Sequence, residues 1–237
     1  MSYDATTTTG KYALALHDNP QPRCPVVLLL DVSTSMTGKP ISELREGVEQ
    51  FFSEIAGDAF ARLSVEAAVV TYGREVKTAV PFHSAADGSL PRTPDLEAIG
   101  CTPMGAAIDK GLSMLGERRD SYRKAGVSSY KPWLVLMTDG QPNDDWEGPA
   151  ARARKQAEDG KLVFFGVGIG PDADMDLLAE ALPSKQPPTR MRGLRFKSFF
   201  KWLSDSLRSV SRDSVESTPE ATDPGEWADP DWTWDFN

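Results

Sequence analysis

The amino-acid sequence predicts an α/β fold, in which a doubly wound, mostly parallel sheet with one antiparallel edge strand has helices on both faces. Two observations carry this prediction. Short apolar runs at residues 26–30 and 134–137 are far below the length of a membrane span and are typical of strands buried on both faces. Stretches of helical periodicity lie between such runs, and this alternation favours a parallel sheet between two layers of helices.

The first strand is expected at residues 25–31 and the first helix soon after it. Pro40 suits the first turn of a helix, and Gly57 suits its end. Between them, apolar residues recur at helical spacing and predict one buried stripe, made of Ile41, Leu44, Val48, Phe51, Phe52 and Ile55.

The antiparallel edge is predicted from the next two segments. Residues 63–72 and 75–82 both have strand character, and only a short Gly73-Arg74 turn separates them. Two strands joined so closely form a hairpin and therefore run antiparallel. Residues 83–100 are mostly turn-forming, and they lead to Thr102.

The second half continues the alternation of helices and strands. Pro103 fits the first turn of the next helix. The expected elements are a helix to about residue 124, a strand at 131–138, a helix around 150–157, a strand at 162–167, a short helix at 174–182, a short strand within 183–193 and a closing helix at 196–210. Ligands of such sheets bind beyond the carboxyl ends of the strands, where the strand order switches.

Composition divides the chain into an N-terminal arm at residues 1–22, a domain at 23–211 and an acidic, Trp-containing tail at 212–237. Residues 213–237 hold eight acidic residues and no Lys or Arg, so they carry −8 of the formal net charge of −9. The preceding residues are nearly neutral and offer no general basis for nucleic-acid binding, which requires an excess of basic residues on one face.

We expect a cytoplasmic protein without a membrane segment. No apolar run approaches the ~20 residues of a membrane span, and residues 1–9 lack the features of a secretory signal. Cys24 and Cys101 fall at opposite ends of the first strand, too far apart for a disulfide. Two unpaired thiols agree with a reducing compartment.

Three oxygen donors follow the first buried strand. Asp31, Ser33 and Ser35 are spaced by two residues, so their side chains can converge in an extended or turning backbone. Oxygen donors with few carboxylates suit Mg²⁺, which usually keeps several waters, and Mn²⁺ or Ca²⁺ would also accept such ligands. The alternative is an ordinary turn rich in Ser and Thr.

Thr102 and Asp139 are further donors at loop positions beside this turn. The set of Asp31, Ser33, Ser35, Thr102 and Asp139 resembles the metal-ion-dependent adhesion site, or MIDAS, of the von Willebrand factor A (vWA) domain, and no element of that motif is missing. The resemblance covers residues 23–211 and implies a Rossmann-like fold. The segment at residues 199–211 is similar to the bacterial tellurium-resistance TerY-like group.

The resemblance implies a metal-dependent protein-binding module, in which an acidic side chain of a partner completes the coordination of the ion. In the TerY-like group it implies an association with a protein kinase and a PP2C-type phosphatase in a bacterial stress or tellurium-resistance system. The alternative is a Mg-dependent phosphohydrolase, because some of these enzymes also use an Asp at a strand end. That chemistry normally needs a second acid near the nucleophile, and Ser33 stands there instead.

The tail combines acidic residues with aromatic ones, Trp227, Trp232, Trp234 and Phe236. Such aromatics are typical anchors of interfaces. We expect the tail to contact the folded body, with its negative charge facing a basic stretch made of Lys185, Arg190, Arg192, Arg195, Lys197 and Lys201. The second possibility is that a tail carboxylate reaches the metal of a neighbouring copy and so causes self-association. The alternatives are a disordered tail and, for the basic stretch, a solvated helix face.

Overall fold

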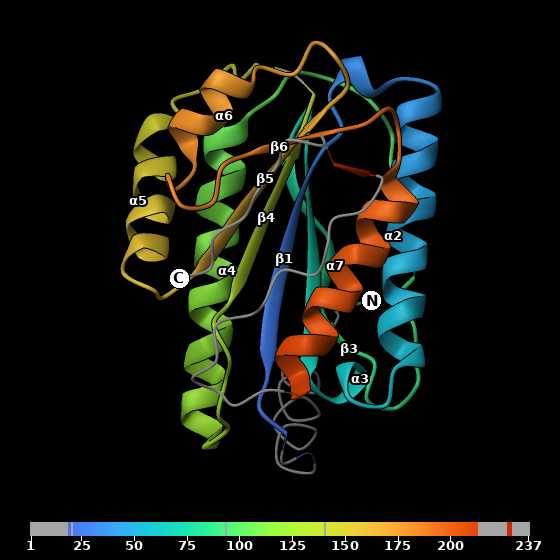
Figure 1. Ribbon diagram of the computed structural model, residues 1–237, viewed down its shortest axis with the longest axis vertical. Coiled ribbons are helices and arrows are strands. Elements are labelled where there is room, and N and C mark those ends of the chain that lie inside the picture. The colour runs from blue at the N-terminus through green and yellow to red at the C-terminus, as the bar shows by residue number, and fades with distance from the viewer. Residues whose placement is uncertain (1–18, 20, 93, 140, 213–226, 229–237) are drawn as a thin grey trace, which may run out of the picture.

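The computed structural model of the chain describes residues 19, 21–92, 94–139, 141–212 and 227–228, and these form a sheet between two helical layers (Figure 1). The sheet has six strands in the order β3-β2-β1-β4-β5-β6. Among the strands of the described residues, only the pair β2–β3 is antiparallel, and β3 is an edge strand, as predicted. The strands are β1 (Cys24–Asp31), β2 (Val65–Tyr72), β3 (Val76–Ser84), β4 (Trp133–Thr138), β5 (Val163–Ile169) and β6 (Thr189–Met191).

The helices cover both faces of the sheet, which confirms the doubly wound prediction (Figure 1). One face carries α2 (Lys39–Gly57) and α7 (Phe196–Arg212), which lie side by side, together with the short α3 (Ala61–Ser64). The other face carries α4 (Met104–Ala125), α5 (Glu147–Glu158) and α6 (Met175–Ala181). A single 3-10 turn, η1 (Thr34–Met36), follows β1.

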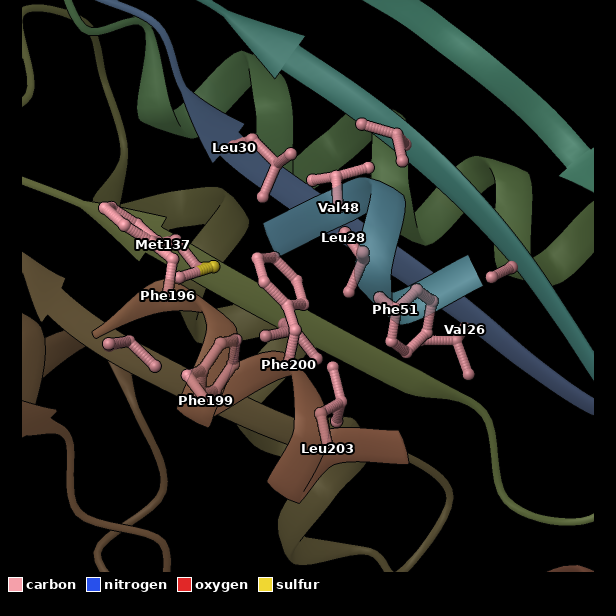
Figure 2. Packing of buried hydrophobic residues seen from close by; sticks show 14 of the residues in the cluster. Val26, Leu28, Leu30, Val48, Phe51, Met137, Phe196, Phe199, Phe200 and Leu203 are labelled. Atoms are coloured by element: carbon pink, nitrogen blue, oxygen red, sulfur yellow. The ribbon is translucent and has the colours of Figure 1, made fainter. Parts of the chain in front are cut away.

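Side chains of β1 alternate between the two layers. Val26, Leu28 and Leu30 face α2 and α7, and Figure 2 shows them beside the phenylalanines of those helices. Val27 and Leu29 face the opposite layer with α4. The apolar run that predicted a strand buried on both faces therefore contributes to both cores.

Some predicted boundaries differ from the structure. Residues 63 and 64, expected in a strand, end α3 instead. The Asp58 carboxylate causes this difference because its Oδ1 accepts the backbone N–H groups of Phe60 at 2.9 Å and Ala61 at 2.8 Å. These bonds cap a helical turn ahead of β2.

A buried ionic cluster lies at the amino end of β1, opposite the end that carries the predicted site. Glu66 of β2 accepts hydrogen bonds at 2.6 Å from Arg118 Nε and from the Tyr122 hydroxyl of α4. Arg23 Nε lies 3.3 Å from Glu66 Oε1, and the side chains of Arg23 and Glu66 are 2% and 3% exposed. Arg23 also donates to the carbonyls of Gln21 at 2.6 Å and of residues 19 and 63 at 3.0 Å. The cluster therefore joins β1, β2 and α4.

The two cysteines are free, as predicted. Cys24 is buried in β1, and burial raises the pKa of its thiol to about 12, whereas Cys101 is exposed. None of the described helices combines the length and apolar character needed to cross a membrane.

Candidate metal centre

The carboxyl ends of β1 and β4 bring the predicted oxygen donors together. Asp31 ends β1, Thr138 ends β4, and Asp139 follows directly. These strands are parallel neighbours in the middle of the sheet. The chain leaves β1 toward α2 on one face and leaves β4 toward α5 on the other. The site is therefore at the switch point, where doubly wound sheets bind ligands.

A continuous chain of hydrogen bonds links four of the five predicted residues. Asp31 Oδ1 accepts the Ser33 backbone N–H at 2.9 Å. The hydroxyls of Ser33 and Ser35 are 2.9 Å apart, and Ser35 Oγ donates to Asp139 Oδ1 at 2.7 Å. Asp31 is fully buried, whereas Ser35 is exposed and Asp139 is half-buried, so the chain of donors runs from the core to the surface.

Thr102 is brought beside this group by backbone pairing of its segment. Ile99 N–H donates to the Val32 carbonyl at 2.8 Å, and Thr34 N–H donates to the Gly100 carbonyl at 3.0 Å. Gly100 has a φ of +90°, and a Cβ there would clash with the backbone N of Arg74, so the close approach of this segment to Arg74 requires glycine. The Thr102 carbonyl accepts from Asn143 N–H at 3.1 Å, which ties the segment to the loop after β4.

Asp144 fixes the start of α4 at the site, a contact that the sequence analysis missed. Its carboxylate oxygens accept the backbone N–H groups of Gly105 at 3.0 Å and Ala106 at 2.9 Å. This carboxylate, from the loop after β4, satisfies donors that a helix N-terminus leaves unpaired. Pro103, predicted in the first turn, lies one residue before the helix as its N-cap.

Both carboxylates of the site resist ionisation in the absence of a cation. Burial raises the pKa of Asp31 to about 6, and the charge of Asp139 adds to the rise, although hydrogen bonds from Ser33 and Thr138 oppose it. Burial also raises the pKa of Asp139, against the hydrogen bond from Ser35. Among the ion pairs of the described residues, none involves either carboxylate. A cation would remove this electrostatic cost.

The donor chemistry fits a hard divalent cation. Asp31 and Asp139 supply carboxylates, and Ser33 and Ser35 supply hydroxyls that already converge on each other. No cluster of three or more His, Cys, Asp or Glu side chains with metal-binding spacing occurs in the described part of the chain, so a site made only of those ligands is not present there. Carboxylate and hydroxyl oxygens suit Mg²⁺ or Mn²⁺ with waters in the remaining positions. Asp31, Ser33, Ser35, Thr102 and Asp139 would hold the ion.

Thr138 is a positioning residue that the sequence analysis missed. Its hydroxyl donates to Asp31 Oδ2 at 2.6 Å and so fixes the rotamer of the buried carboxylate. The only signal in the sequence is a hydroxyl residue at the end of an apolar strand, which is also an ordinary strand pattern.

Thr138→Val should lower divalent-metal affinity by about 10- to 100-fold, because partners that orient metal ligands have effects of that size. Thr71→Val is the matched control: Thr71 is also a buried Thr near the carboxyl end of a strand, and its hydroxyl has no hydrogen-bond partner among the described residues. Isothermal titration with Mn²⁺ measures both variants. Equal affinities would contradict the role given to Thr138.

The fold and the site together define a class: a doubly wound α/β domain with a cluster of oxygen donors at its switch point. The chain belongs to the von Willebrand factor type A domain family, whose sequence model matches residues 26–193. The resemblance inferred from the motif is thereby confirmed at the level of the family.

Similar proteins differ widely in source. Inter-alpha-trypsin inhibitor heavy chain H1 of Bos taurus is 24% identical over 159 residues, which are 65% of this chain and 17% of that protein. A manganese-loaded TRAP protein of Plasmodium vivax aligns with a TM-score of 0.50 at 18% identity, covering 73% of this chain and 69% of that one. Proximal thread matrix protein 1 of the mussel byssus, with a zinc-occupied MIDAS motif, also has a TM-score of 0.50 at 18% identity, covering 79% and 48%. The chain thus matches only a small part of the bovine relative, and the solved structures support the fold.

Proposed function

We propose that the chain is a non-enzymatic protein-binding module that recognises its partner through a divalent cation held at the β1–β4 switch point. The observation that carries this proposal is the network from Asp31 through Ser33 and Ser35 to Asp139, in which both carboxylates have raised pKa values. The mussel protein with a zinc-occupied MIDAS motif and the manganese-loaded TRAP protein, which share the fold, support a divalent ion as the ligand. Mg²⁺ is our proposed ion, with Mn²⁺ or Ca²⁺ as substitutes.

The proposed recognition follows from the charge of the site. Asp31 and Asp139 only neutralise a divalent ion, and the hydroxyls of Ser33 and Ser35 add no charge. A Glu or Asp of a protein partner would therefore gain direct electrostatic attraction when it replaces a water on the ion. The half-buried Asp139 and the exposed Ser35 leave this side of the site open to solvent.

We further propose a cytoplasmic scaffold or adaptor in a bacterial stress or tellurium-resistance system, linked to a protein kinase and a PP2C-type phosphatase. The similarity of residues 199–211 to the TerY-like group supports this context. The nearly neutral body supports protein over nucleic-acid partners, and the composition supports a role away from the membrane.

The phosphohydrolase alternative is less compatible with the geometry. Both oxygens of Asp31 already accept hydrogen bonds, at 2.9 Å from Ser33 N–H and 2.6 Å from Thr138, and the side chain is fully buried. A carboxylate held in this way is better placed as a metal ligand than as a nucleophile. The enzyme would be favoured instead if the purified chain turned over a phosphatase substrate and Asp31→Asn abolished that activity.

A pulldown with matched variants tests the proposal. Asp139→Asn should lose metal-dependent partner binding, whereas Asp172→Asn, an exposed Asp after β5 at the same end of the sheet, should retain it. Partners captured from a lysate in Mg²⁺ are then purified, and their affinity is measured with and without EDTA. Full affinity in EDTA, or equal loss in both variants, would contradict metal-mediated recognition.

A further inference from the structure

The described part of the tail extends the sheet beyond its last strand. Ala228 forms an antiparallel bridge with Met191 of β6, and the backbone N–H of Arg192 donates to the Trp227 carbonyl at 2.8 Å. β6 is the outermost strand on this side and has only three residues. Tail residues therefore cover an edge that would otherwise present unpaired backbone groups.

Trp227 fills an aromatic pocket beneath this edge. Its side chain is 1% exposed. The ring centroid lies 4.9 Å from that of Phe199, 5.0 Å from that of Trp202 and 6.3 Å from that of Phe165. Phe165 comes from β5, and the other two come from α7. A buried Trp among three aromatic rings is the kind of anchor that dominates interfaces.

Trp227 and Ala228 carry no charge, so their contact rests on backbone pairing and ring packing, whereas the acidic residues expected to face the basic stretch lie outside the described part of the chain. Lys197 pairs with Glu46 at 2.7 Å, and Lys201 lies 3.5 Å from Asp205. Arg190 donates to the Gly170 carbonyl at 2.7 Å. Backbone pairing gives an extended segment affinity for a sheet edge, and a side-chain pocket gives specificity, here for Trp.

The connection from α7 to Trp227 has the composition of a tether. Residues 213–226 contain five acidic residues and two prolines, with Val215 and Ala221 as their only apolar residues. A connection of this length gives its end a local concentration of about millimolar, so contact within one chain is favoured at ordinary protein concentrations.

We infer that the edge of β6 and the pocket of Phe165, Phe199 and Trp202 form a docking site for an extended, Trp-containing segment. The chain's own Trp227 and Ala228 occupy this docking site in cis. The same segment of a second copy occupies it when the tether cannot reach. This inference goes beyond the proposed function and is independent of the cation, so EDTA should leave the docking unchanged.

Shortening the tether tests exchange between copies. Residue 212, where α7 ends, lies about 15 Å along the helix axis from Trp202, and the chain must cover that distance to bring Trp227 back beside Trp202. Deletion of residues 213–224 leaves two residues between residue 212 and Trp227, and these let the chain reach only about 11 Å. In sedimentation at micromolar concentration, this deletion should therefore double the mass of the sedimenting species relative to the parent chain. Deletion of residues 213–218 leaves eight residues and should leave the sedimenting species as in the parent chain. Trp227→Ala in the shorter chain should restore the sedimentation of the parent chain. Equal sedimentation of the two deletions would overturn exchange.

A labelled peptide of residues 222–234 tests the site in the full chain, where no deletion can impair folding. Fluorescence anisotropy should show the peptide binding to Trp227→Ala at least about tenfold more tightly than to the parent, whose site is filled in cis. Trp232→Ala, another Trp of the same tail, should behave like the parent. The docking site would be overturned if the peptide bound equally to the parent, Trp227→Ala and Trp232→Ala chains. It would also be overturned if a peptide with Ala in place of Trp227 bound the Trp227→Ala chain as tightly as the original peptide does.

Discussion

Asp31→Asn should abolish divalent-metal binding and also raise the free energy of unfolding of the metal-free protein at pH 7. The variant removes a carboxylate that is fully buried and has no cationic partner among the described residues. The Asn carbonyl can still accept from Ser33 N–H, and the Thr138 hydroxyl can rotate to accept from the amide. The loss of metal binding and the gain in stability have the same origin, which is the desolvated charge.

The sign of the pH dependence follows from the raised pKa of Asp31. Its pKa rises from an ordinary 3.8 to about 6 in the folded protein, which corresponds to about 3 kcal/mol. Protonated Asp31 contributes this stability fully below pH 4, and the contribution is lost as the pH rises through 6. The metal-free parent should therefore lose stability between these pH values relative to Asp31→Asn.

Urea unfolding of the metal-free protein at several pH values, with titration calorimetry for Mg²⁺ and Mn²⁺, measures both effects. Asp172→Asn is the control because Asp172 is exposed at the same end of the sheet. Parallel curves of stability against pH for Asp31→Asn and the parent would show that Asp31 is not the titrating group. Metal binding retained by Asp31→Asn would remove this residue from the site.

Glu66→Gln should lower the free energy of unfolding by about 3–5 kcal/mol, because breaking a buried ion pair leaves uncompensated charge in the interior. Arg23 is 1% exposed, and Arg118 and Tyr122 both donate to the same Glu66 oxygen. The variant keeps the shape of the side chain and removes only its charge. Metal affinity should change little, since the cluster is at the opposite end of β1 from Asp31.

Urea unfolding at pH 7 measures this cost, with Asp109→Asn as the matched control. Asp109 pairs with Arg152 at 2.5 Å, but the two side chains are 50% and 57% exposed. An exposed pair of this kind contributes about 0–1 kcal/mol. A loss for Glu66→Gln as small as that for the control would mean that desolvation cancels the attraction in the buried cluster.

The fold could be predicted because its signals are local. The run at residues 26–30 is apolar at every position, which a strand buried on both faces requires, and the Gly73-Arg74 turn indicates the hairpin directly. The donors Asp31, Ser33 and Ser35 could be predicted because they follow such a strand at fixed spacing. Their role as metal ligands stays a prediction, although the structure brings them together with Asp139.

Other contacts could not be predicted because their partners are distant in the sequence. Glu66 is the only charged residue in the run at residues 65–72, and nothing near it in the sequence identifies its partner Arg118, which is 52 positions away. The Asp144 cap on α4 and the Thr138 hydroxyl on Asp31 also depend on which strands become neighbours. Contact of the tail with the body was expected and is found at Trp227 and Ala228, whereas its remaining residues lie outside the described part of the chain.

The contrast between the two cysteines gives the protein a single attachment point for a reporter dye. A maleimide dye reacts with thiolates, and the buried Cys24 thiol, with a pKa of about 12, is protected from it. The exposed Cys101 is available and directly precedes Thr102. One labelling step on the unaltered sequence therefore places a fluorophore beside the proposed metal ligands, where a change in its emission on addition of Mg²⁺ or Mn²⁺ would report the proposed binding.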